Sequence, residues 1–264
     1  MLMIYFSGTG NSKYIAERFS AKMGGICHSI EEDVDFAALL SAHDTVGVCY
    51  PIYGSRVPWI MREFATKHMD GFAGKKLVIF ATQLIFSGDG ARVFTDLFSK
   101  GHAEVIYAAH FVMPNNVNNL FFLRQTSDGR TRRQLARAER QMEEICRDIR
   151  NGITRKAGFS GFAKFFGNMQ GKAWQGDSKS AGTCEGSLEH KARQGVKVSE
   201  DCDGCGLCAR ICPMKNLVCG DGRVEHRNNC TICYRCVNAC PKKAITVFFH
   251  AKPKWQYEGI GEQV

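Results

Sequence analysis

Short apolar segments alternate with stretches of helical periodicity along residues 1–115. The apolar segments are rich in Val, Ile and aromatic residues, as buried parallel strands are; they span residues 2–6, 26–30, 45–50, 76–82 and 103–113. Between them, apolar positions three and four residues apart predict three helices, with these faces: Ile15, Ala16, Phe19 and Met23; Ile60, Met61, Phe64 and Met69; Val93, Phe94, Leu97 and Phe98. This alternation predicts a parallel α/β sheet with helices on both faces.

A long helix is predicted over residues 131–150, and we expect it to close the first domain at residue 151. Its apolar side chains repeat at intervals of three and four: Leu135, Ala138, Met142, Ile145 and Ile149. Residues 152–194 then change character, because glycines and aromatic residues are scattered there without a period. We interpret this segment as a linker with local helix near 160–170 or 186–193, whose aromatic residues pack between domains.

Length and composition fit a globular protein of about two domains, since 44% of the 264 residues are hydrophobic and 23% are charged. We expect neither a membrane span nor a secretory signal, because the longest apolar runs are short and the N-terminus lacks a basic segment and a cleavage site. Thirteen cysteines without an export signal favour metal or redox chemistry over disulfides.

The net charge of +9 is concentrated in the middle of the chain. Residues 1–120 contain 10 basic and 11 acidic side chains, residues 121–200 contain 16 and 9, and residues 201–264 contain 9 and 6. A solvated helix face and linker explain the basic excess most simply, while an acidic partner, an anionic surface and nucleic acid are alternatives. The nucleic-acid alternative lacks a recognisable nucleic-acid-binding fold.

The strongest motif is a doubled cysteine run. CDGCGLCARICP begins at residue 202 and CTICYRCVNACP at residue 230, so four cysteines and a proline recur at one offset of 28 residues. Each copy has the C-x2-C-x2-C-x3-C-P spacing of bacterial ferredoxins, in which three thiolates bind one cubane and the fourth reaches its neighbour. The spacing predicts two 4Fe–4S clusters, one on Cys202, Cys205, Cys208 and Cys240 and the other on Cys230, Cys233, Cys236 and Cys212.

A pair of structural zinc sites is the alternative chemistry, but such sites usually separate two C-x2-C pairs by a longer spacer. The prolines lead into segments 216–220 and 244–249, which we predict to be short strands. Residues 195–250 therefore resemble a small α+β two-cluster ferredoxin domain, followed by a tail at 251–264. Five cysteines outside the predicted ligands are interpreted as small buried side chains: Cys27, Cys49, Cys146, Cys184 and Cys219.

The first strand leads into Ser7-Gly8-Thr9-Gly10-Asn11-Ser12 and then a helix. Neither the dinucleotide nor the Walker glycine motif is present, but hydroxyls, an amide and glycine backbone at a helix N-terminus suit a terminal monophosphate. The loop resembles the flavodoxin signature, [ST]-x-T-G-N-[ST] after a strand, and every position matches. With the alternating pattern, this identifies residues 1–151 as a flavodoxin-like domain, which implies a doubly wound parallel sheet.

The resemblance implies bound FMN, with its phosphate on Ser7, Thr9, Gly10, Asn11 and Ser12. Ligands of such sheets lie beyond the carboxyl ends of the strands, which selects the loops after the third and fourth strands for the ring. The residues expected there are Pro51, Ile52, Tyr53, Gly54, Thr82, Gln83, Ser87, Gly88 and Gly90, with Phe86 as a further candidate. No catalytic residue is predicted, and His110 is the one histidine expected to face this site.

The order of the two domains resembles the flavodoxin–ferredoxin fusion proteins of anaerobic bacteria over nearly the whole chain. The resemblance implies a cytoplasmic electron-transfer iron–sulfur flavoprotein that uses FMN and two 4Fe–4S clusters, with a redox protein as donor or acceptor. The alternative is an FMN-dependent reductase that delivers the electrons to a small oxidised substrate of the quinone, azo or enone type.

Overall fold

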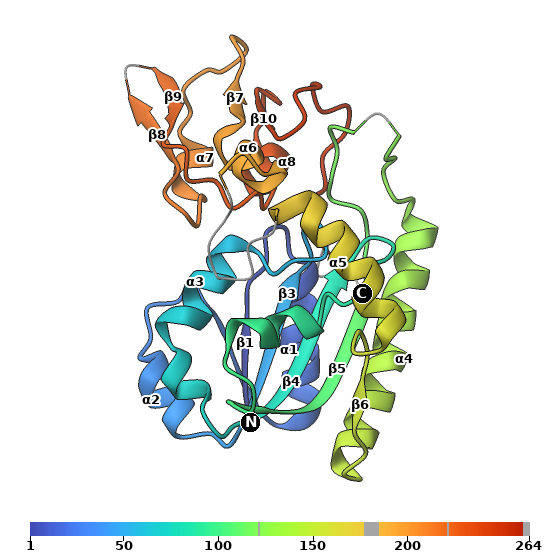
Figure 1. Cartoon of the computed structure of the whole chain (residues 1–264). Helices are drawn as coiled ribbons and strands as arrows, with labels where there is room; N and C mark the ends of the chain where they lie inside the picture. The colour runs from blue at the N-terminus through green and yellow to red at the C-terminus, as the bar shows by residue number, and fades with distance from the viewer. Residues whose placement is uncertain (121, 177–184, 221, 261–264) are drawn as a thin grey trace.

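A six-stranded parallel sheet forms the larger part of the computed structural model, which describes residues 1–120, 122–176, 185–220 and 222–260 (Figure 1). The strand order β2-β1-β3-β4-β5-β6 contains the 2-1-3-4-5 order of flavodoxin-like folds. The strands are β1 (Leu2–Tyr5), β2 (Ile26–Ser29), β3 (Thr45–Pro51), β4 (Lys76–Gln83), β5 (Glu104–Val112) and β6 (Arg155–Lys156). The five strands predicted from apolar segments are confirmed, and β6 comes from the predicted linker.

Helices cover both faces of this sheet, as the sequence predicts. One face packs against α1 (Asn11–Met23) and α4 (Asp128–Arg150), where Phe19 of α1 meets Phe80 of β4 edge to face at 4.7 Å. The other face packs against α2 (Phe36–Ser41), α3 (Trp59–Lys67) and two 3₁₀ helices, η1 (Met69–Phe72) and η2 (Arg92–Leu97). None of the helices in the described residues is long and apolar enough to cross a bilayer.

Two helical segments differ from the expectation. The predicted helix around Val93 is a 3₁₀ helix, at whose end the Thr95 carbonyl accepts the N–H of Phe98 at 3.3 Å, three residues on. Helix α2 was not predicted, because six residues are too few for periodicity to show. It begins where the Asp35 carboxylate accepts the N–H of Ala38 at 3.0 Å, an N-cap that stabilises a short helix.

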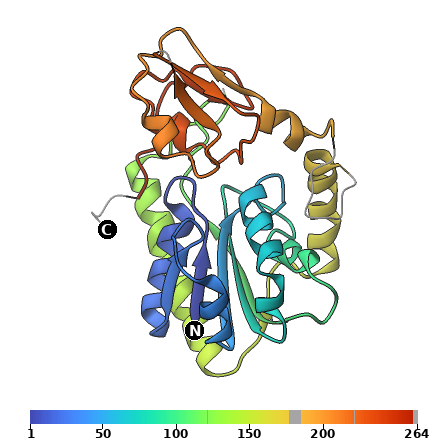
Figure 2. The same cartoon turned by 90° about the vertical axis from the view of Figure 1, so that its left-hand side faces the viewer.

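The local helix predicted in the linker is present and longer than expected. Helix α5 (Gly161–Gln175) lies against loops of the sheet domain, and α6 (Leu188–Gln194) leads into the smaller module. Figures 1 and 2 both show this module above the end of the sheet where the parallel strands end. Its elements are β7 (Val196–Val198), α7 (Leu207–Arg210), β8 (Leu217–Gly220), β9 (Arg223–His226), α8 (Arg235–Ala239) and β10 (Ile245–Val247).

The sequence repeat of the small module is also a repeat of backbone conformation. Gly204 and Gly206 have φ values of 69°, and the equivalent residues of the second copy, Ile232 and Tyr234, have φ values of 60°. Left-handed backbone is uncommon for residues other than glycine, so packing has to hold Ile232 and Tyr234 in it. Both side chains are buried, and the module has its own apolar core between the β10–β7 and β8–β9 antiparallel pairs.

A buried ion pair joins the sheet domain to the segment that precedes the module. Arg62 of α3 donates from Nη2 to both carboxylate oxygens of Glu189 on α6, at 2.9 and 2.8 Å. Each residue is 2% exposed. The Arg62 guanidinium also lies 5.3 Å from the ring centroid of Trp59. An ion pair this far from water stabilises only while both partners are present.

His110 lies under the η2 segment and does not line the cavity at the phosphate loop. Its Nε2 accepts the backbone N–H of Ala91 at 3.0 Å, which fixes that nitrogen as an acceptor and the ring as neutral. Burial lowers the pKa of His110 from 6.5 to about 4. The expectation that His110 faces the flavin site is therefore wrong, because the ring is used to hold the loop after β4.

We expect Glu189→Ala to lower the free energy of unfolding by about 3 to 5 kcal/mol, because it leaves the Arg62 charge buried without its carboxylate. Urea denaturation followed by tryptophan fluorescence measures the change, since Trp59 lies beside Arg62. The double variant Arg62→Met/Glu189→Leu should recover most of the loss. A double variant as unstable as Glu189→Ala would contradict this account.

Neutral His110 should make stability depend on pH. Because its pKa is about 4 in the folded protein and near 6.5 when unfolded, the unfolded chain takes up the proton first. The stability from this residue is complete above about pH 6.5 and decreases as pH falls toward 4, by at most about 3 kcal/mol. Denaturation midpoints measured across this range should fall less in His110→Gln than in the wild type; parallel profiles would refute the prediction.

Candidate functional site

The phosphate loop, residues 7–12, is fixed by one hydrogen bond within the loop and by side-chain hydrogen bonds to distant segments. The N–H of Gly10 bonds to Ser7 Oγ at 3.0 Å, and Gly10 adopts the left-handed conformation with φ 101° where α1 begins. Asn11 donates to the carbonyl of Pro114 at 2.9 Å, and the hydroxyls of Ser12 and Thr82 lie 2.7 Å apart. Hydroxyl and amide groups therefore converge at a helix N-terminus, the donor set that suits a phosphate.

A cavity opens above this loop at the carboxyl ends of the strands. It is bordered by β1, β3, β4 and the segment after β5, which is where a doubly wound sheet binds its ligand. Its lining residues are Ser7, Gly8, Thr9, Asn11, Ser12, Pro51, Ile52, Tyr53, Thr82, Gln83, Leu84, Met113, Pro114, Asn116 and Val117. The loop donors, the apolar side chains and the aromatic ring of Tyr53 match the phosphate and the flat ring of FMN in chemistry.

Five residues predicted for FMN do not line this cavity. Gly10 precedes the first residue of α1. The other four lie in the loops after β3 and β4, which pack against α5 and against each other: Gly54, Ser87, Gly88 and Gly90. A Cβ at Gly54 would overlap the Trp174 ring, and one at Gly88 would come within 2.6 Å of the Gly167 nitrogen. Ser87 donates a hydrogen bond to the Gln83 side chain. Their assignment to the flavin stays a prediction.

The segment after β5 borders the cavity and was not predicted from the sequence. Asn116 donates to Thr9 Oγ1 at 2.7 Å, so this segment fixes a hydroxyl of the phosphate loop. Tyr257, from the predicted tail, donates to Asn11 Oδ1 at 2.7 Å. The cluster of asparagines at 115, 116, 118 and 119 directly after a buried strand was the available signal. No sequence pattern near Tyr257 indicates that it contacts this loop.

The eight predicted ligand cysteines lie around two separate small cavities of the module. One is bordered by Cys202, Cys205, Cys208 and Cys240, and the other by Cys212, Cys230, Cys233 and Cys236. Each cavity therefore combines three cysteines of one copy with the last cysteine of the other, the combination that the spacing predicts. Among the described residues, no three His, Cys, Asp or Glu side chains are grouped closely enough for a single metal ion.

Backbone amides point at the sulfur atoms around both cavities. The N–H of Asn216 donates to Cys212 Sγ and that of Ala244 to Cys240 Sγ, each at 3.3 Å, and these two bonds are equivalent in the repeat. Such donors stabilise thiolate ligands and adjust cluster potential. Burial raises the pKa of Cys208 to about 11 and that of Cys230 to about 12. Bound iron would favour the thiolate form of these cysteines.

The cysteines predicted to lie outside the clusters are placed differently from the ligands. Cys49 and Cys146 are buried in the sheet domain, and burial raises the pKa of Cys27 to about 12. Cys219 is exposed rather than buried, because it lies on the edge pair β8–β9 and its thiol donates to the Gly204 carbonyl at 3.2 Å. Cys184 lies outside the described residues.

The cavity on Cys212, Cys230, Cys233 and Cys236 is next to the phosphate loop. The carbonyl of Cys233 packs so closely on Gly8 that a Cβ there would overlap it. Between the two sites, Arg235 donates to the carbonyls of Ser7 at 2.8 Å, Gly8 at 3.1 Å and Ile211 at 3.0 Å, and pairs with Glu31 at 2.7 Å. This arginine was not predicted; the signal was a charge where the first copy has Leu207.

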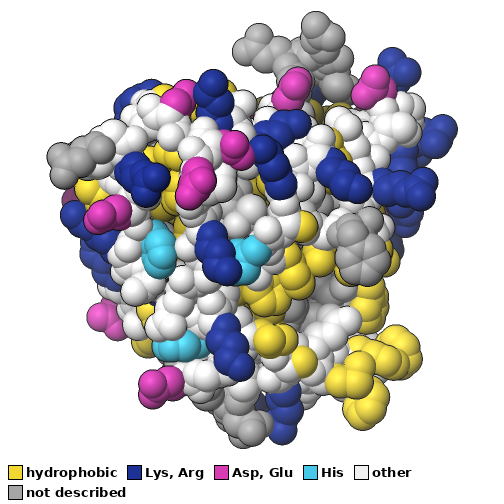
Figure 3. Space-filling view, turned by 90° about the horizontal axis from the view of Figure 1, so that it is seen from above, with side chains coloured by type: hydrophobic (Ala, Val, Ile, Leu, Met, Phe, Trp, Pro, Cys, Tyr) yellow, Lys and Arg dark blue, Asp and Glu magenta, His cyan; other side chains and the backbone are white. Residues whose placement is uncertain are grey.

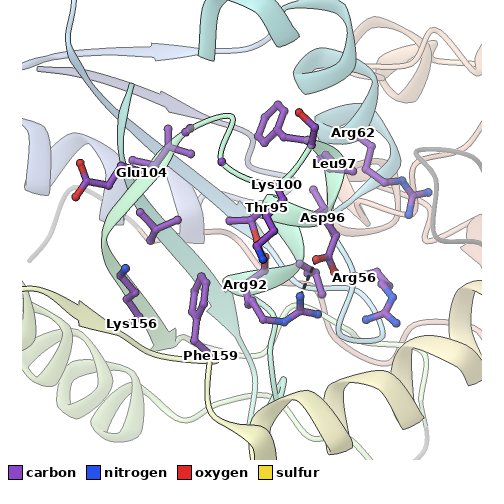
Figure 4. Close-up of a pocket in the computed structure, with 18 of the residues that line it drawn as sticks. Arg56, Arg62, Arg92, Thr95, Asp96, Leu97, Lys100, Glu104, Lys156 and Phe159 are labelled. Atoms are coloured by element: carbon purple, nitrogen blue, oxygen red, sulfur yellow. Dashed lines mark hydrogen bonds and ion pairs between the residues drawn. The ribbon is translucent and has the colours of Figure 1, made fainter. Parts of the chain in front are cut away.

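A separate cavity of about 930 Å³ lies between η2, β5 and α5 (Figure 4). Arg56, Arg92 and Lys156 lie at its walls, together with apolar residues such as Phe159. Arg92 is paired with Asp96 at 2.6 Å, so part of the charge is neutralised within the wall. No residue predicted for FMN or iron lines it.

Comparisons with known proteins agree with this geometry. The family model described as a flavodoxin domain matches residues 2–147, and that of a 4Fe-4S binding domain matches residues 196–217, which include the first cysteine run. A search of curated proteins found no match.

Several solved structures resemble the N-terminal half. A flavodoxin from the domain Archaea is 14% identical with a TM-score of 0.39, over 56% of this chain and 97% of its own. Two-electron reduced flavodoxin of Megasphaera elsdenii is 21% identical with a TM-score of 0.37, over 53% and 99%. A putative flavoprotein from Bacteroides eggerthii is 21% identical with a TM-score of 0.35, over 52% and 96%. Because the flavodoxin model covers more than half of the sequence, the chain belongs to the flavodoxin domain family, and the 4Fe-4S domain that follows gives it the flavodoxin–ferredoxin fusion architecture.

Proposed function

We propose that the chain transfers electrons between two 4Fe–4S clusters and FMN, in the order outer cluster, inner cluster, flavin. The flavodoxin and 4Fe–4S domains support an electron-transfer flavin and iron–sulfur protein. When bound, the clusters exchange single electrons and FMN holds one or two. The outer cluster is assigned to Cys202, Cys205, Cys208 and Cys240, and the inner cluster to Cys212, Cys230, Cys233 and Cys236. The order rests on one observation, the contact of Cys233 with Gly8.

This contact leaves no protein layer between the inner cysteines and the phosphate loop. Cys233 is 7% exposed and packs into the core of the sheet domain rather than that of its own module. Asparagines of the loop after β5 also bind the second cysteine run, because Tyr234 donates to Asn119 Oδ1 at 3.1 Å and Asn118 donates to Asn238 Oδ1 at 3.0 Å. The loop that borders the flavin cavity thus also holds the inner cluster in place.

One of the four outer cysteines is exposed and none of the inner four is, which supports the outer site as the exchange point with a separate redox protein. Cys205 is exposed, whereas Cys230 and Cys233 are buried. Charged side chains of both signs surround this site, including a Lys252–Asp201 pair at 2.7 Å and a Lys242–Asp203 pair at 3.9 Å. A surface of this kind selects a partner by electrostatic complementarity and affects the association rate most.

The proposed domain boundaries are 1–151, 152–194 and 195–250, with a tail at 251–264. The tail, as far as residue 260, contributes to both sites, since Tyr257 bonds to Asn11 through its hydroxyl and to Asn238 Oδ1 through its N–H at 2.7 Å. Residues 261–264 lie outside the described part of the tail. The linker also contributes to the sheet domain, because β6 pairs with β5 and α5 packs on the loops at Gly54 and Gly88.

The alternative function is an FMN-dependent reductase for a small quinone, azo compound or enone. It uses the same internal path and differs only at the flavin, where a reductase needs room for a substrate and a proton donor within hydrogen-bond reach. Tyr53, one of the residues that line the cavity, is the candidate donor. Steady-state turnover of such a substrate that is abolished in Tyr53→Phe favours the reductase. Electron delivery to a protein acceptor that is unchanged in Tyr53→Phe favours the carrier.

Replacing one ligand of each proposed cluster tests the order. The anaerobically purified wild type should contain about eight iron atoms and one FMN, and Cys205→Ala and Cys233→Ala should each lose about four irons while retaining FMN. Because the path is serial, reduction of the flavin by a reduced protein donor should slow about tenfold or more in both variants. Stopped-flow absorbance measures it. A wild-type rate in Cys205→Ala would contradict the order, and zinc in place of iron would contradict the clusters.

Arg235→Gln should slow flavin reduction about tenfold while iron and FMN contents stay normal, because the side chain holds the inner site on the phosphate loop. Arg210→Gln is the matched control. Arg210 also donates to a backbone carbonyl of a cysteine run, that of Cys205 at 3.1 Å, but in the outer copy. Equal rates in the two variants would show that Arg235 has no particular role. Loss of cofactor from Arg235→Gln would show a structural role instead.

A further inference from the structure

Helix α5 packs on the sheet domain through its smallest residues. Ala163, Gly167 and Gly171 are buried and recur at intervals of four. A Cβ at Gly167 would overlap the Asp89 carboxylate, and one at Gly171 would overlap the Arg56 guanidinium. The helix backbone therefore lies directly on the loops, and Arg56 donates to the Gly167 carbonyl at 3.3 Å.

Trp174, near the end of the helix, packs on Gly54 and Phe248, but the large apolar side chains of its first half face away from the protein rather than packing between domains. Phe162, Phe165 and Met169 are 67, 65 and 55% exposed, and their spacing of three and four places them in one stripe. The loop after β4 adds two exposed residues, Ile85 and Phe86, and the Phe86 ring lies 6.3 Å from that of Phe166. We call this set the aromatic patch: Ile85, Phe86, Phe162, Phe165, Phe166 and Met169. Figure 3 shows hydrophobic side chains gathered toward one edge of the molecule and protruding from it.

This arrangement is the reverse of an ordinary surface helix, which buries its large apolar side chains and exposes small or polar ones. The aromatic rings of α5 instead contact one another, with Phe162 at 4.6 Å and Phe165 at 5.3 Å from Phe166. They contribute little to holding the helix on the domain. Contiguous exposed apolar groups of this kind mark a surface that binds something else.

The charge around the aromatic patch is positive. Helix α5 carries Lys164 and Lys172, both exposed, and neither the helix nor residues 84–88 contain an acidic residue. A helix with phenylalanines on its outer face and lysines beside them is complementary to a membrane surface that contains anionic lipids.

We propose that the aromatic patch docks the protein on membranes rich in anionic lipid, with the phenylalanine rings in the headgroup region and Lys164 and Lys172 beside the lipid phosphates. Phenylalanine and methionine would also suit a protein partner, but protein interfaces are depleted in lysine. Lysines beside an apolar helix face instead suit anionic lipid. Five of the six side chains of the patch are exposed, as those of a surface that enters a lipid layer are. The proposal needs neither cofactor and does not depend on the proposed function.

Vesicle flotation tests the proposal with the full-length protein. Vesicles of phosphatidylcholine with phosphatidylglycerol should bind the wild type, and vesicles of phosphatidylcholine alone should bind it more weakly. The variant Phe162→Ser/Phe165→Ser should reduce the partition coefficient roughly tenfold or more. Ile26→Ser/Val34→Ser is the matched control, because it removes two exposed apolar residues, 41 and 37% exposed, at the β2 side of the sheet. Its binding should equal that of the wild type.

Each other outcome overturns the proposal. No binding of the wild type, or equal binding by the phenylalanine variant, excludes docking through the patch. Binding that Lys164→Gln/Lys172→Gln and added salt leave unchanged excludes an anionic surface. If the wild type elutes as a dimer and does not bind vesicles, and the variant Phe162→Ser/Phe165→Ser is a monomer, the patch binds a second copy of the chain. Circular dichroism of the variants confirms that a loss of binding is not a loss of fold.

Discussion

Arg235 joins the two halves of the molecule on which electron transfer depends. Its planar guanidinium has donors in fixed directions, and these meet carbonyls of the phosphate loop and of the cysteine run while the charge pairs with Glu31. A flexible lysine could not satisfy these acceptors together. Because three of its acceptors are backbone carbonyls, the position of the inner cysteines relative to the loop follows largely from the course of the main chain in both domains.

The two cysteine copies share a backbone conformation but differ in their surroundings. The first copy has Gly204 and Gly206 where the second has Ile232 and Tyr234 in the same left-handed conformation. Glycine adopts this conformation without strain at the outer site. The second copy can retain large residues there because burial and the Tyr234–Asn119 hydrogen bond hold them. The repeat therefore became asymmetric at the positions that contact the flavodoxin domain.

The sequence predicts what is local or periodic. Buried strands, the phosphate loop and the cysteine spacing are each encoded within about a dozen residues, and the sheet and the domain order follow from them. Contacts between distant segments leave no such pattern, so Tyr257, Arg235 and the loop at 113–117 were missed. Gly54 and Gly88 show the same limit of sequence-based prediction, although here the sequence did single out the residues. Glycine signals a close approach of backbone, but only the structure identifies helix α5 as the neighbour.

The composition of α5 follows from how closely it must lie on these loops. With larger residues at positions 167 and 171, the helix would stand away from Asp89 and Arg56 and lose the hydrogen bond to Arg56. Close backbone packing thus excludes large side chains at positions 163, 167 and 171, but it does not require phenylalanine on the outer face. Polar residues there would satisfy the packing equally and would avoid exposed apolar surface. The outer aromatic residues therefore need an explanation outside the fold of the isolated chain, and a surface that covers them supplies it.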